Sequence, residues 1–366
     1  MSASTSPERT RVVVAMSGGV DSSTAAALLV EQGYEVIGIM MRLWAGTGPD
    51  GGAYNRCCSP EAVADARTVC VRLGIPFHLL NFEASFKKNV VDFFLDGYAR
   101  GVTPNPCLEC NRHVKFDALL QQALALGADT LATGHYARVT RAANGRHQLL
   151  KGLDPQKDQS YALSMLTQRQ LARAMFPLGE YTKQQVRALA RERRIIVAEK
   201  SESQELCFVV KDYRAFVQEH RPSAFVPGPI LDTSGKLLGQ HIGLPAYTIG
   251  QRKGLQMAVG EPLYVVGMDA AKNSLIVGRD QEVWQSHMRV IQINWIADEI
   301  PAAAHVKIRY KSEEAPAHVE WDMERMCADV TFSEPQRALT PGQAAVFYQG
   351  DVCLGGGIIS RVGSPK

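Results

Sequence analysis

Short β-branched runs alternate with longer stretches of helical periodicity between Arg11 and about Ala137. The runs predict strands, and apolar residues at three- and four-residue spacing predict helices between them. The expected strands are Val12–Met16, Glu35–Met41, Phe77–Phe82 and Thr130–Gly134, and the expected helices are Ser22–Gln32, Pro60–Leu73, Ser85–Tyr98 and Asn111–Leu126. This alternation is typical of a parallel sheet with crossover helices. We therefore expect an α/β fold here, with a doubly wound parallel sheet.

The pattern changes twice further along the chain. A hairpin is expected over Arg138–Gly152, around the turn pair Asn144-Gly145, and helical segments follow from Asp158 to about Arg194. From about Phe208, short alternating strands are separated by Gly, Pro and Asp. Regularly spaced strands then predict a small antiparallel β-barrel, at Val290–Ile296, His305–Tyr310, His318–Asp322, Ala328–Phe332, Ala344–Tyr348 and Val352–Ile359. We divide the chain into residues 1–215, a small central β-rich module at 216–286 and the barrel at 287–366.

Composition places the chain among folded, soluble proteins. Its 366 residues are 46% hydrophobic and 21% charged, which excludes wholesale disorder, collagen and coiled coil. No apolar run approaches the roughly 18 residues of a membrane span, and the polar segment Met1–Thr10 lacks a signal peptide's apolar stretch. A cytoplasmic protein without a membrane partner is expected. The net charge of +3 neither demands nor excludes a nucleic-acid partner.

The sharpest chemical signal is the loop Ser17–Ser23, which directly follows the first expected strand and opens the first helix. Two glycines let the backbone approach an anion, serine hydroxyls can donate to it, and a helix N-terminus adds free amides. The loop lacks the lysine of a Walker A motif and is not a dinucleotide fingerprint. It resembles the PP-loop of the N-type ATP pyrophosphatases, which implies cleavage of ATP between its α and β phosphates. Asp21 is either a magnesium ligand or a helix cap.

Two cysteine segments carry further candidate chemistry. Cys107 and Cys110 form a C-x-x-C in a proline-rich loop, and Asn111 can cap the following helix, so Cys110 is expected at a helix N-terminus, where a thiolate is stabilised. Half a zinc site or a thioredoxin-like dithiol are the rival interpretations. Zinc is not expected, because Cys57 and Cys58 are adjacent and badly spaced as a second ligand pair. Cys207 is either a buried core residue or, given its polar flank, part of an exposed loop.

A basic stretch and a histidine complete the candidates. Seven cationic residues face two acidic ones over Gln168–Arg194, which favours either phosphate binding or an ordinary solvated helix face. The cationic residues are Arg169, Arg173, Lys183, Arg187, Arg191, Arg193 and Arg194. His135 follows the end of an expected strand, where ligands of α/β domains bind, although a purely structural histidine is equally compatible with the pattern.

Taken together, these motifs resemble the tRNA-specific 2-thiouridylase family over nearly the whole chain. They occur in the expected order as Ser17–Ser23, Asn105-Pro106 with Cys110-Asn111, Thr133–Tyr136, Lys157–Tyr161, the Cys207 segment, Gly250–Leu255, and Pro341–Gln343 with Cys353–Gly357. The resemblance implies an enzyme that adenylates the 2-oxygen of the wobble uridine in tRNA. Sulfur carried as a cysteine persulfide then replaces that oxygen. Activation converts a poor leaving group into a good one, so an ATP-cleaving loop and nucleophilic sulfur belong together.

The resemblance also assigns residues by position. Cys207 would bear the persulfide, and Cys110 would be the second catalytic cysteine. The ATP pocket would be lined by Ala15, Met16, Ser17, Gly18, Gly19, Val20, Asp21, Ser22, Met41 and Gly134. The tRNA would be contacted by Asn105, Pro106, Cys107, His135, Lys157, Asp158, Gln159, Arg309, Tyr310 and Gln343. Cys107 departs from the pattern, since other members can carry Asp there, and we expect it to be dispensable.

The implied cofactors and partners follow from this assignment. ATP is the co-substrate, Mg²⁺ is expected with it, and a cysteine desulfurase or sulfur relay would supply the sulfur. Two rival functions remain open at the level of sequence. One is another adenylating ligase with a PP-loop, which would need an ammonia source that is not evident in the sequence. The other is a non-catalytic RNA-binding protein that retains the nucleotide pocket, which the complete Ser17–Ser23 loop and the retained Cys110 and Cys207 disfavour.

Overall fold

The computed structural model describes residues 10–44, 46–47, 53–54, 59–201, 206–209, 212–255 and 261–362. Most of the polar N-terminus, the Cys57-Cys58 pair and part of the Cys207 segment lie outside the described residues. The chain divides into two compact units. Unit 1 comprises Met1–Asn89, Cys107–Val210 and Asp351–Cys353, and unit 2 comprises Val90–Pro106, Lys211–Gly350 and Leu354–Lys366.

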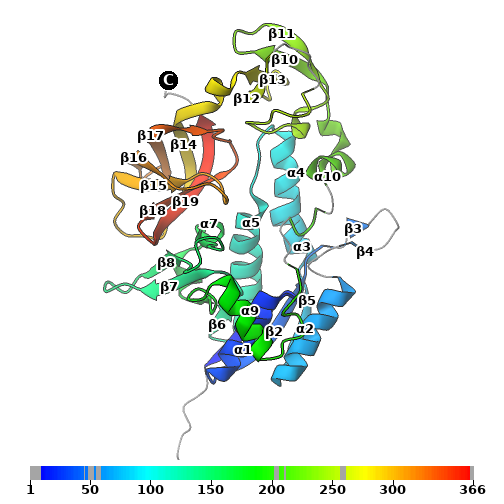
Figure 1. The fold of residues 1–366 in the computed structure, drawn as a ribbon, viewed down its shortest axis with the longest axis vertical. Helices are drawn as coiled ribbons and strands as arrows, with labels where there is room; N and C mark the ends of the chain where they lie inside the picture. The colour runs from blue at the N-terminus through cyan, green and yellow to red at the C-terminus, as the bar shows by residue number, and fades with distance from the viewer. Residues whose placement is uncertain are drawn as a thin grey trace, which may run out of the picture. The chain divides into compact units, whose positions relative to one another are not determined.

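Unit 1 is built on a parallel sheet of five strands in the order β5-β2-β1-β6-β9 (Figure 1). The strands are β1 (Arg11–Met16), β2 (Glu35–Arg42), β5 (Phe77–Asn81), β6 (Thr130–Ala132) and β9 (Ala174–Met175). Val12 of β1 pairs with Val36 of β2 on one side and with Thr130 of β6 on the other. The chain therefore moves outward from β1 through β2 to β5 and returns to the other side of β1. This confirms the predicted doubly wound sheet, although the sequence did not predict the short strand β9.

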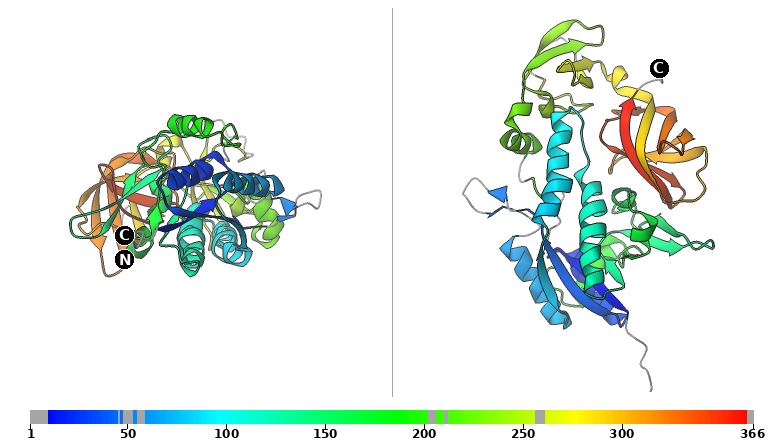
Figure 2. Two further views of the ribbon diagram at one scale, coloured as in Figure 1. Left: turned by 90° about the horizontal axis from the view of Figure 1, so that it is seen from below. Right: turned by 180° about the vertical axis from the view of Figure 1, so that it is seen from behind.

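Helices cover both faces of this sheet, as Figure 2 shows. One face carries α1 (Val20–Glu31), α2 (Pro60–Leu73) and α9 (Lys183–Glu192). The other face carries the continuous helical stretch of α5 (Pro106–Glu109), η2 (Cys110–Leu119) and α6 (Leu120–Ala125), in which η2 has π-helical geometry. The expected Pro60–Leu73 helix is confirmed, with Ser59 accepting a hydrogen bond from the amide of Ala62 as its N-cap.

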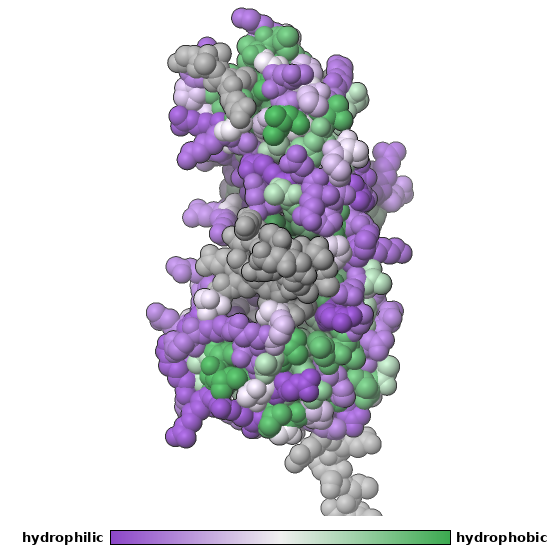
Figure 3. Space-filling view, turned by 90° about the vertical axis from the view of Figure 1, so that its right-hand side faces the viewer, coloured by the Kyte–Doolittle hydropathy of each residue, from purple (hydrophilic) through white to green (hydrophobic). Residues whose placement is uncertain are grey.

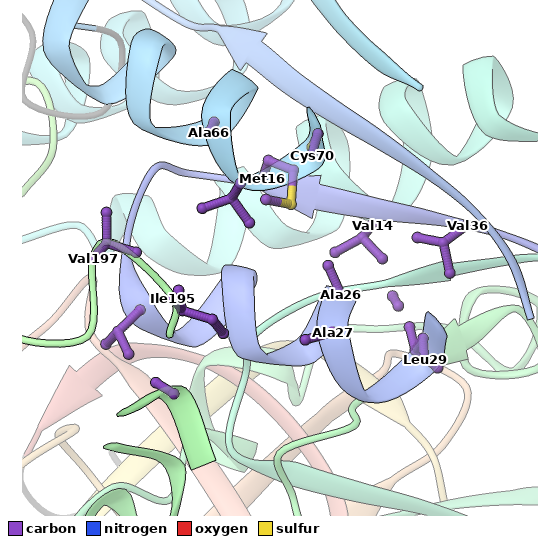
Figure 4. Packing of buried hydrophobic residues seen from close by; sticks show 14 of the residues in the cluster. Val14, Met16, Ala26, Ala27, Leu29, Val36, Ala66, Cys70, Ile195 and Val197 are labelled. Atoms are coloured by element: carbon purple, nitrogen blue, oxygen red, sulfur yellow. The ribbon is translucent and has the colours of Figure 1, made fainter. Parts of the chain in front are cut away.

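Buried side chains from β1, α1, α2 and the segment after α9 meet in one core (Figure 4). Val14 and Met16 of β1 pack with Ala26 and Leu29 of α1, with Cys70 of α2, and with Ile195 and Val197 of the segment after α9. Small alanines on α1 let the helix lie close to the sheet. This core fixes the end of β1, where the Ser17–Ser23 loop begins.

The remaining elements of unit 1 are a hairpin and several short helices and strands. The predicted hairpin is present as β7 (Ala137–Arg141) and β8 (His147–Lys151). Shorter elements are β3 (Gly46–Thr47), β4 (Ala53–Tyr54), α3 (Glu83–Phe86), η1 (Lys87–Val91), α7 (Ser160–Leu163) and α8 (Gln168–Leu171). Exposed apolar residues on α2 and β5 include Val71 and Leu79. The face in Figure 3 shows hydrophobic side chains interspersed with hydrophilic ones.

Unit 2 contains helices, a four-stranded sheet and a barrel. Its helical elements are α4 (Asp92–Ala99), α10 (Tyr213–His220), η3 (Pro222–Ala224), η4 (Leu244–Ala246) and η5 (Asp280–Val283). The four-stranded sheet has the order β11-β10-β13-β12 and consists of β10 (Gly228–Asp232), β11 (Leu237–His241), β12 (Tyr264–Asp269) and β13 (Ser274–Gly278). Ile230, Val265 and Leu275 lie in its buried core. The predicted central β-rich module is therefore present.

The C-terminal strands form the predicted closed antiparallel barrel. Its order is β14-β17-β16-β15-β18-β19, and the additional pairing of β14 with β19 closes it. The strands are β14 (Trp284–Trp295), β15 (Ala303–Lys307), β16 (Ala315–Asp322), β17 (Cys327–Arg337), β18 (Ala344–Gln349) and β19 (Val352–Val362). Trp295, Trp321 and Phe347 pack edge to face or tilted in its interior, with Trp295 and Trp321 ring centroids 4.5 Å apart. No helix within the described ranges is long and apolar enough to cross a membrane.

Candidate functional site

The Ser17–Ser23 loop, hereafter the PP-loop, leaves the end of β1 and enters α1. Ser22 Oγ accepts a hydrogen bond from the Ser17 amide at 3.1 Å and lies 3.3 Å from the Gly19 carbonyl oxygen, to which it donates. Gly18 has a φ of +70°, and a Cβ there would lie 2.3 Å from the Ala62 carbonyl oxygen, so only glycine fits. Gly19 is the N-cap of α1 and offers no side-chain cap. The first amides of α1 are therefore available to an anion.

Gly134 brings a second strand end to the PP-loop. It follows β6, and β1 and β6 are neighbours at the point where the sheet order reverses, which is where doubly wound sheets bind ligands. A Cβ on Gly134 would lie 2.9 Å from both the carbonyl carbon of Asp21 and the amide nitrogen of Ser22. The absence of a side chain thus lets the loop pack directly on the end of β6. Ala15, Met16, Val20 and Met41, also expected at the nucleotide, lie on β1, α1 and β2 beside this loop.

Asp21 is held by two residues from distant parts of unit 1. Lys183 Nζ of α9 donates to both carboxylate oxygens at 2.7 and 2.8 Å, and the Tyr136 hydroxyl donates to Oδ1 at 2.7 Å. The Lys183 side chain is only 11% exposed. Asp21 is therefore not a helix cap, and its charge is already compensated. The structure thus brings a lysine to the PP-loop from α9.

The carboxylates of the described residues do not provide a ready metal site. No group of three or more His, Cys, Asp or Glu side chains within the described ranges could hold a metal ion. Asp21 is the acidic residue of the PP-loop, and Lys183 occupies both of its oxygens. In this arrangement the described residues do not fit a protein-bound Mg²⁺, whose usual ligands are one or two carboxylates together with phosphate oxygens.

His135 lies beyond the end of β6 and is 9% exposed. Thr133 Oγ1 is 2.7 Å from its Nδ1, and Lys115 Nζ of η2 is 3.4 Å from its Nε2. Because an ammonium only donates, Nε2 is the acceptor and Nδ1 donates to Thr133. Burial and the nearby Lys115 ammonium hold the pKa of His135 well below its ordinary value of 6.5. The ring is neutral, and packs near Phe116 and Phe176.

The segment Lys157–Gln159 is a structured turn. The buried Asp158 accepts hydrogen bonds from the amides of Gly152 and Ser160, both at 3.0 Å, and from the Ser160 hydroxyl at 2.9 Å. Gln159 accepts from the Tyr136 amide through Oε1 at 2.9 Å and donates its own amide to the Tyr136 carbonyl. Lys157 is half-buried. Asp158 and Gln159 therefore shape the turn, and Lys157 is the member with a partly exposed cationic side chain.

The structure corrects the expected placement of Cys110. Helical structure begins at Pro106, so Cys110 lies at the fifth residue of a continuous helical stretch and not at its N-terminus. Cys110 is 8% exposed, whereas Cys107, one turn earlier, is exposed. Asn111 is also not a cap, because it lies inside the helix and donates through Nδ2 to the Ala162 carbonyl at 2.8 Å. Its Oδ1 is buried without a partner among the described residues. The sequence pattern missed this because Pro106 occupies the first helical turn, where proline is favoured.

Glu109 adds a half-buried acid beside Cys110. Its Oε2 lies 3.2 Å from Nε2 of His113, one helical turn later. Burial raises the pKa of Glu109, and the nearby His113 and Arg112 oppose that rise. The C-x-x-C segment therefore carries an exposed thiol, a buried thiol and a carboxyl group whose pKa is raised by burial.

Cys207 is half-buried and its neighbour Phe208 is buried. The Phe208 ring packs edge to face on Phe86 of α3, with centroids 5.7 Å apart. Helix α3 also packs against η2, which carries Cys110. The two cysteines thus lie in one unit on segments that share α3 as a neighbour.

Three further candidate residues belong to unit 2. The Arg309 guanidinium donates to the Ala338 carbonyl oxygen and, at 3.3 Å, to Thr340 Oγ1. Tyr310 is 40% exposed. Gln343 donates through Nε2 to the Thr103 carbonyl at 2.9 Å. Asn105 and Pro106 also belong to unit 2, whereas Cys107 belongs to unit 1.

The basic stretch Gln168–Arg194 engages protein groups with most of its cations. Lys183 binds Asp21, Arg193 binds Glu31 through two contacts at 2.6 and 2.8 Å, and Arg191 binds Glu199 at 2.6 Å. Arg173 donates to the Asp129 carbonyl, and Arg187 donates to the carbonyls of Ala198 and Lys200. These five side chains therefore already have partners within the protein. The sequence shows the charges but carries no local signal for these partners, which lie elsewhere in the sequence.

Three family profiles match the chain in succession. Residues 10–211 match the tRNA methyl transferase HUP domain, residues 214–279 the tRNA methyl transferase PRC-barrel domain, and residues 285–359 the aminomethyltransferase β-barrel domain. Full-length relatives are also similar. The tRNA-specific 2-thiouridylase MnmA of Carboxydothermus hydrogenoformans is 51% identical over 96% of this chain and 98% of its own. The enzyme of the same name from Geotalea uraniireducens is 50% identical over 98% and 97%.

Similarity to solved structures is more distant. A 4-thiouridine synthetase in complex with RNA and bound ATP aligns with 58% of this chain and 51% of its own at 17% identity, with a TM-score of 0.34. The NMN synthetase of Francisella tularensis aligns with 54% and 67% at 15% identity, with a TM-score of 0.33. These scores are too low to support an inference about this chain.

Proposed function

Since the chain belongs to the tRNA-specific 2-thiouridylase family, we propose that it catalyses the ATP-dependent 2-thiolation of the wobble uridine in tRNA. The observation that carries this proposal is the identity of about half of all residues with relatives of that name over 96% of the chain. The PP-loop and the cysteines Cys110 and Cys207 are present in the same chain. An activating site and a sulfur nucleophile are the two requirements of the reaction.

The first step is adenylation of the uracil 2-oxygen. The ATP phosphates lie on the free amides at the start of α1, with the exposed Ser17 as a hydroxyl donor. The buried Ser22 hydroxyl closes the loop on Ser17 and Gly19. The 2-oxygen attacks the α-phosphorus, the bond to the β-phosphate oxygen breaks, and pyrophosphate leaves. Lys183, next to the loop, compensates the negative charge that develops on the departing pyrophosphate. The product is a base whose oxygen leaves readily as AMP.

The second step replaces AMP by sulfur. The outer sulfur of a Cys207 persulfide attacks the activated 2-carbon, and AMP departs. The Cys110 thiolate then attacks Sγ of Cys207, the bond between the two sulfurs of the persulfide breaks, and the thiolated base leaves with its electron pair. A Cys110–Cys207 disulfide remains and requires a thiol reductant before the next turnover. In the alternative order, Cys110 first releases the outer sulfur as free sulfide, which attacks the base and leaves the same disulfide.

Contacts with tRNA involve residues of both units. Asn105, Pro106 and Cys107 meet the target base, and Lys157, Arg309, Tyr310 and Gln343 meet the surrounding nucleotides. His135, Asp158 and Gln159 are held by protein partners, so they act by shaping the surface. In this proposal residues 1–215 carry the chemistry, and residues 216–286 and 287–366 hold tRNA. A cysteine desulfurase or sulfur relay supplies the sulfur, and the reaction takes place in the cytoplasm.

Thin-layer chromatography of ATP labelled at the α or γ phosphate tests the proposed cleavage. With tRNA present, the α label should appear in AMP and the γ label in pyrophosphate. The Asp21→Ala variant should yield neither, because Lys183 loses the partner that orients it at the loop. ADP as the labelled product would refute adenylation and show that the protein catalyses phosphoryl transfer.

A further inference from the structure

Helix α9 contacts two functional segments of unit 1 from one face. Lys183 and Arg187 are four residues apart, so their side chains project from neighbouring positions on the helix. Lys183 binds Asp21 of the PP-loop, as described above. Arg187 donates through Nη1 to the Ala198 carbonyl at 2.6 Å and through Nη2 to the Lys200 carbonyl at 3.3 Å. One helix therefore holds both the PP-loop and the Ala198–Lys200 backbone.

The segment that Arg187 holds is also fixed by other contacts. Ile195 and Val197 are buried in the core of Figure 4, and Ala198 belongs to the same cluster. Lys200 Nζ binds Asp65 Oδ2 of α2 at 2.6 Å. On the far side of Cys207, Phe208 packs on Phe86. Among the described residues, the chain is thus restrained at Ala198–Lys200 and again at Phe208, on the two sides of Cys207. Arg187 adds side-chain donors to the carbonyls of a backbone whose amides of Ala198 and Lys200 already donate to Ile195 and Val197.

We propose that Arg187 is a positioning residue for sulfur transfer, acting through the Ala198–Lys200 backbone to keep Cys207 within reach of the activated base. This inference rests on the proposed function. The planar guanidinium donates to two carbonyls at once, so it fixes the direction of the chain as well as its distance from α9. Without the guanidinium, these two carbonyls are hydrogen-bonded to water instead, and the segment regains backbone freedom. Lys183 remains bound to Asp21, so the PP-loop keeps its geometry.

The expected consequence is a loss of the sulfur step with the adenylation step retained. A displacement of about 1 Å at a reacting group can cost on the order of a hundredfold in rate. For Arg187→Ala we expect thiolation to slow by about ten- to a hundredfold. Arg187→Lys, which can reach one carbonyl with its ammonium, should recover part of that loss. If Arg187 had a purely structural role, its replacement would instead lower the thermal stability and the rates of both steps together.

The test uses the full chain with tRNA and separates the two steps. Transfer of label from α-labelled ATP to tRNA without a sulfur donor measures adenylation. The yield of 2-thiouridine per unit time with sulfur present measures the complete reaction. Arg191→Ala is the matched control, because Arg191 lies one turn further on α9 and binds the side chain of Glu199 in the same segment, with both partners well exposed. An exposed ion pair contributes little, so this variant should match the wild type in both assays.

The outcomes separate this inference from the function on which it rests. Slow thiolation with wild-type adenylation in Arg187→Ala, partial recovery in Arg187→Lys and no effect of Arg191→Ala support it. Equal loss of both steps, or wild-type thiolation in Arg187→Ala, overturns it. If Arg187→Ala does not fold, the same comparison is made between Arg187→Lys and the wild type. A wild-type protein that forms no 2-thiouridine refutes the proposed function itself, whatever the variants do.

Discussion

The cysteines of unit 1 differ in the environments that decide their chemistry. Cys70 is fully buried in the sheet core, and burial raises the pKa of its thiol to about 11, so it remains a packing residue. Cys107 is exposed, Cys110 is buried and Cys207 is half-buried. A reaction that ends in a disulfide needs two of these thiols to meet. Cys110 and Cys207 lie on segments that share α3, which favours them over Cys107.

Serine substitutions should separate these roles. Cys110→Ser and Cys207→Ser should each abolish thiolation of tRNA and leave tRNA binding intact, because the hydroxyl keeps the volume of the side chain and removes the sulfur. Cys107→Ser and Cys107→Asp should keep substantial activity. Mass spectrometry of nucleosides and a filter-binding assay provide the two readouts. An active Cys207→Ser enzyme would eliminate the persulfide mechanism, and an active Cys110→Ser beside an inactive Cys107→Asp would reverse the assignment within the C-x-x-C.

Two buried histidines should make the stability of the protein depend on pH. Burial lowers the pKa of His241, whose Nδ1 accepts from the Gly243 amide and whose Nε2 lies 3.0 Å from the Asn273 carbonyl. The pKa of His135 is lowered as well. Between the folded pKa values and about 6.5, the unfolded chain binds protons that the folded chain does not. The free energy of unfolding should therefore be highest above about pH 6.5 and fall as the pH decreases below it.

Denaturant unfolding at about pH 7.5 and pH 5.5 measures this loss. His241→Gln should show a smaller loss between the two pH values than the wild type, because the titrating ring is gone. His318→Gln serves as the control, since His318 is exposed on β16. Equal losses in His241→Gln and the wild type would exclude His241 as a source of the pH dependence.

At the scale of elements, the PP-loop depends on its contact with the end of β6. The Cβ of an alanine at position 134 would lie 2.9 Å from backbone atoms of Asp21 and Ser22, and backbone atoms cannot move aside easily. Gly134→Ala should therefore destabilise the protein by about 1–3 kcal/mol and impair ATP cleavage. Gly19→Ala is the steric control, because its Cβ would meet only Ser17 Oγ, at 3.4 Å. A Gly134→Ala protein with wild-type thermal stability would disprove the close packing of loop and strand.

The elements that the sequence predicted well are those with a strong local pattern. Helix α2 has a serine N-cap, a proline in its first turn and a glycine at its end, and its predicted bounds agree with the structure. The two residues of β9 are too few to produce the alternation of apolar and polar residues that predicts a strand. The contact between Lys183 and Asp21 spans 162 positions, so no local pattern could indicate it. The burial of Ser22 has no local signal either, because it comes from the hydroxyl closing the loop on Ser17.

At the scale of the whole molecule, tRNA binding cannot rest on net charge, which is only +3. It must depend on particular cations. Arg193 is bound bidentately to Glu31 and already has its counter-ion. Lys157, half-buried at the turn after the β7-β8 hairpin, is assigned to tRNA by the family resemblance and by our proposal. Phosphate contacts release counter-ions, so each lost contact reduces the salt dependence of binding.

Affinity for tRNA measured across a salt series tests this distinction. Lys157→Ala should weaken binding and reduce the slope of log affinity against log salt concentration by about 1. Lys157→Arg should restore the slope, because it keeps the charge. Arg193→Ala should leave the slope nearly unchanged. A reduced slope for Arg193→Ala with an unchanged slope for Lys157→Ala would show that the phosphate contact lies in the basic stretch Gln168–Arg194 and not at Lys157.

The proposed function requires that this chain place sulfur on the wobble uridine of tRNA. Mass spectrometry of nucleosides detects that product, on tRNA incubated with the purified protein, ATP and a sulfur source. We expect 2-thiouridine at the wobble position with the wild-type protein, and none without ATP or with Cys207→Ser. Unmodified wobble uridine after incubation with folded wild-type protein, ATP, sulfur and a thiol reductant would contradict it.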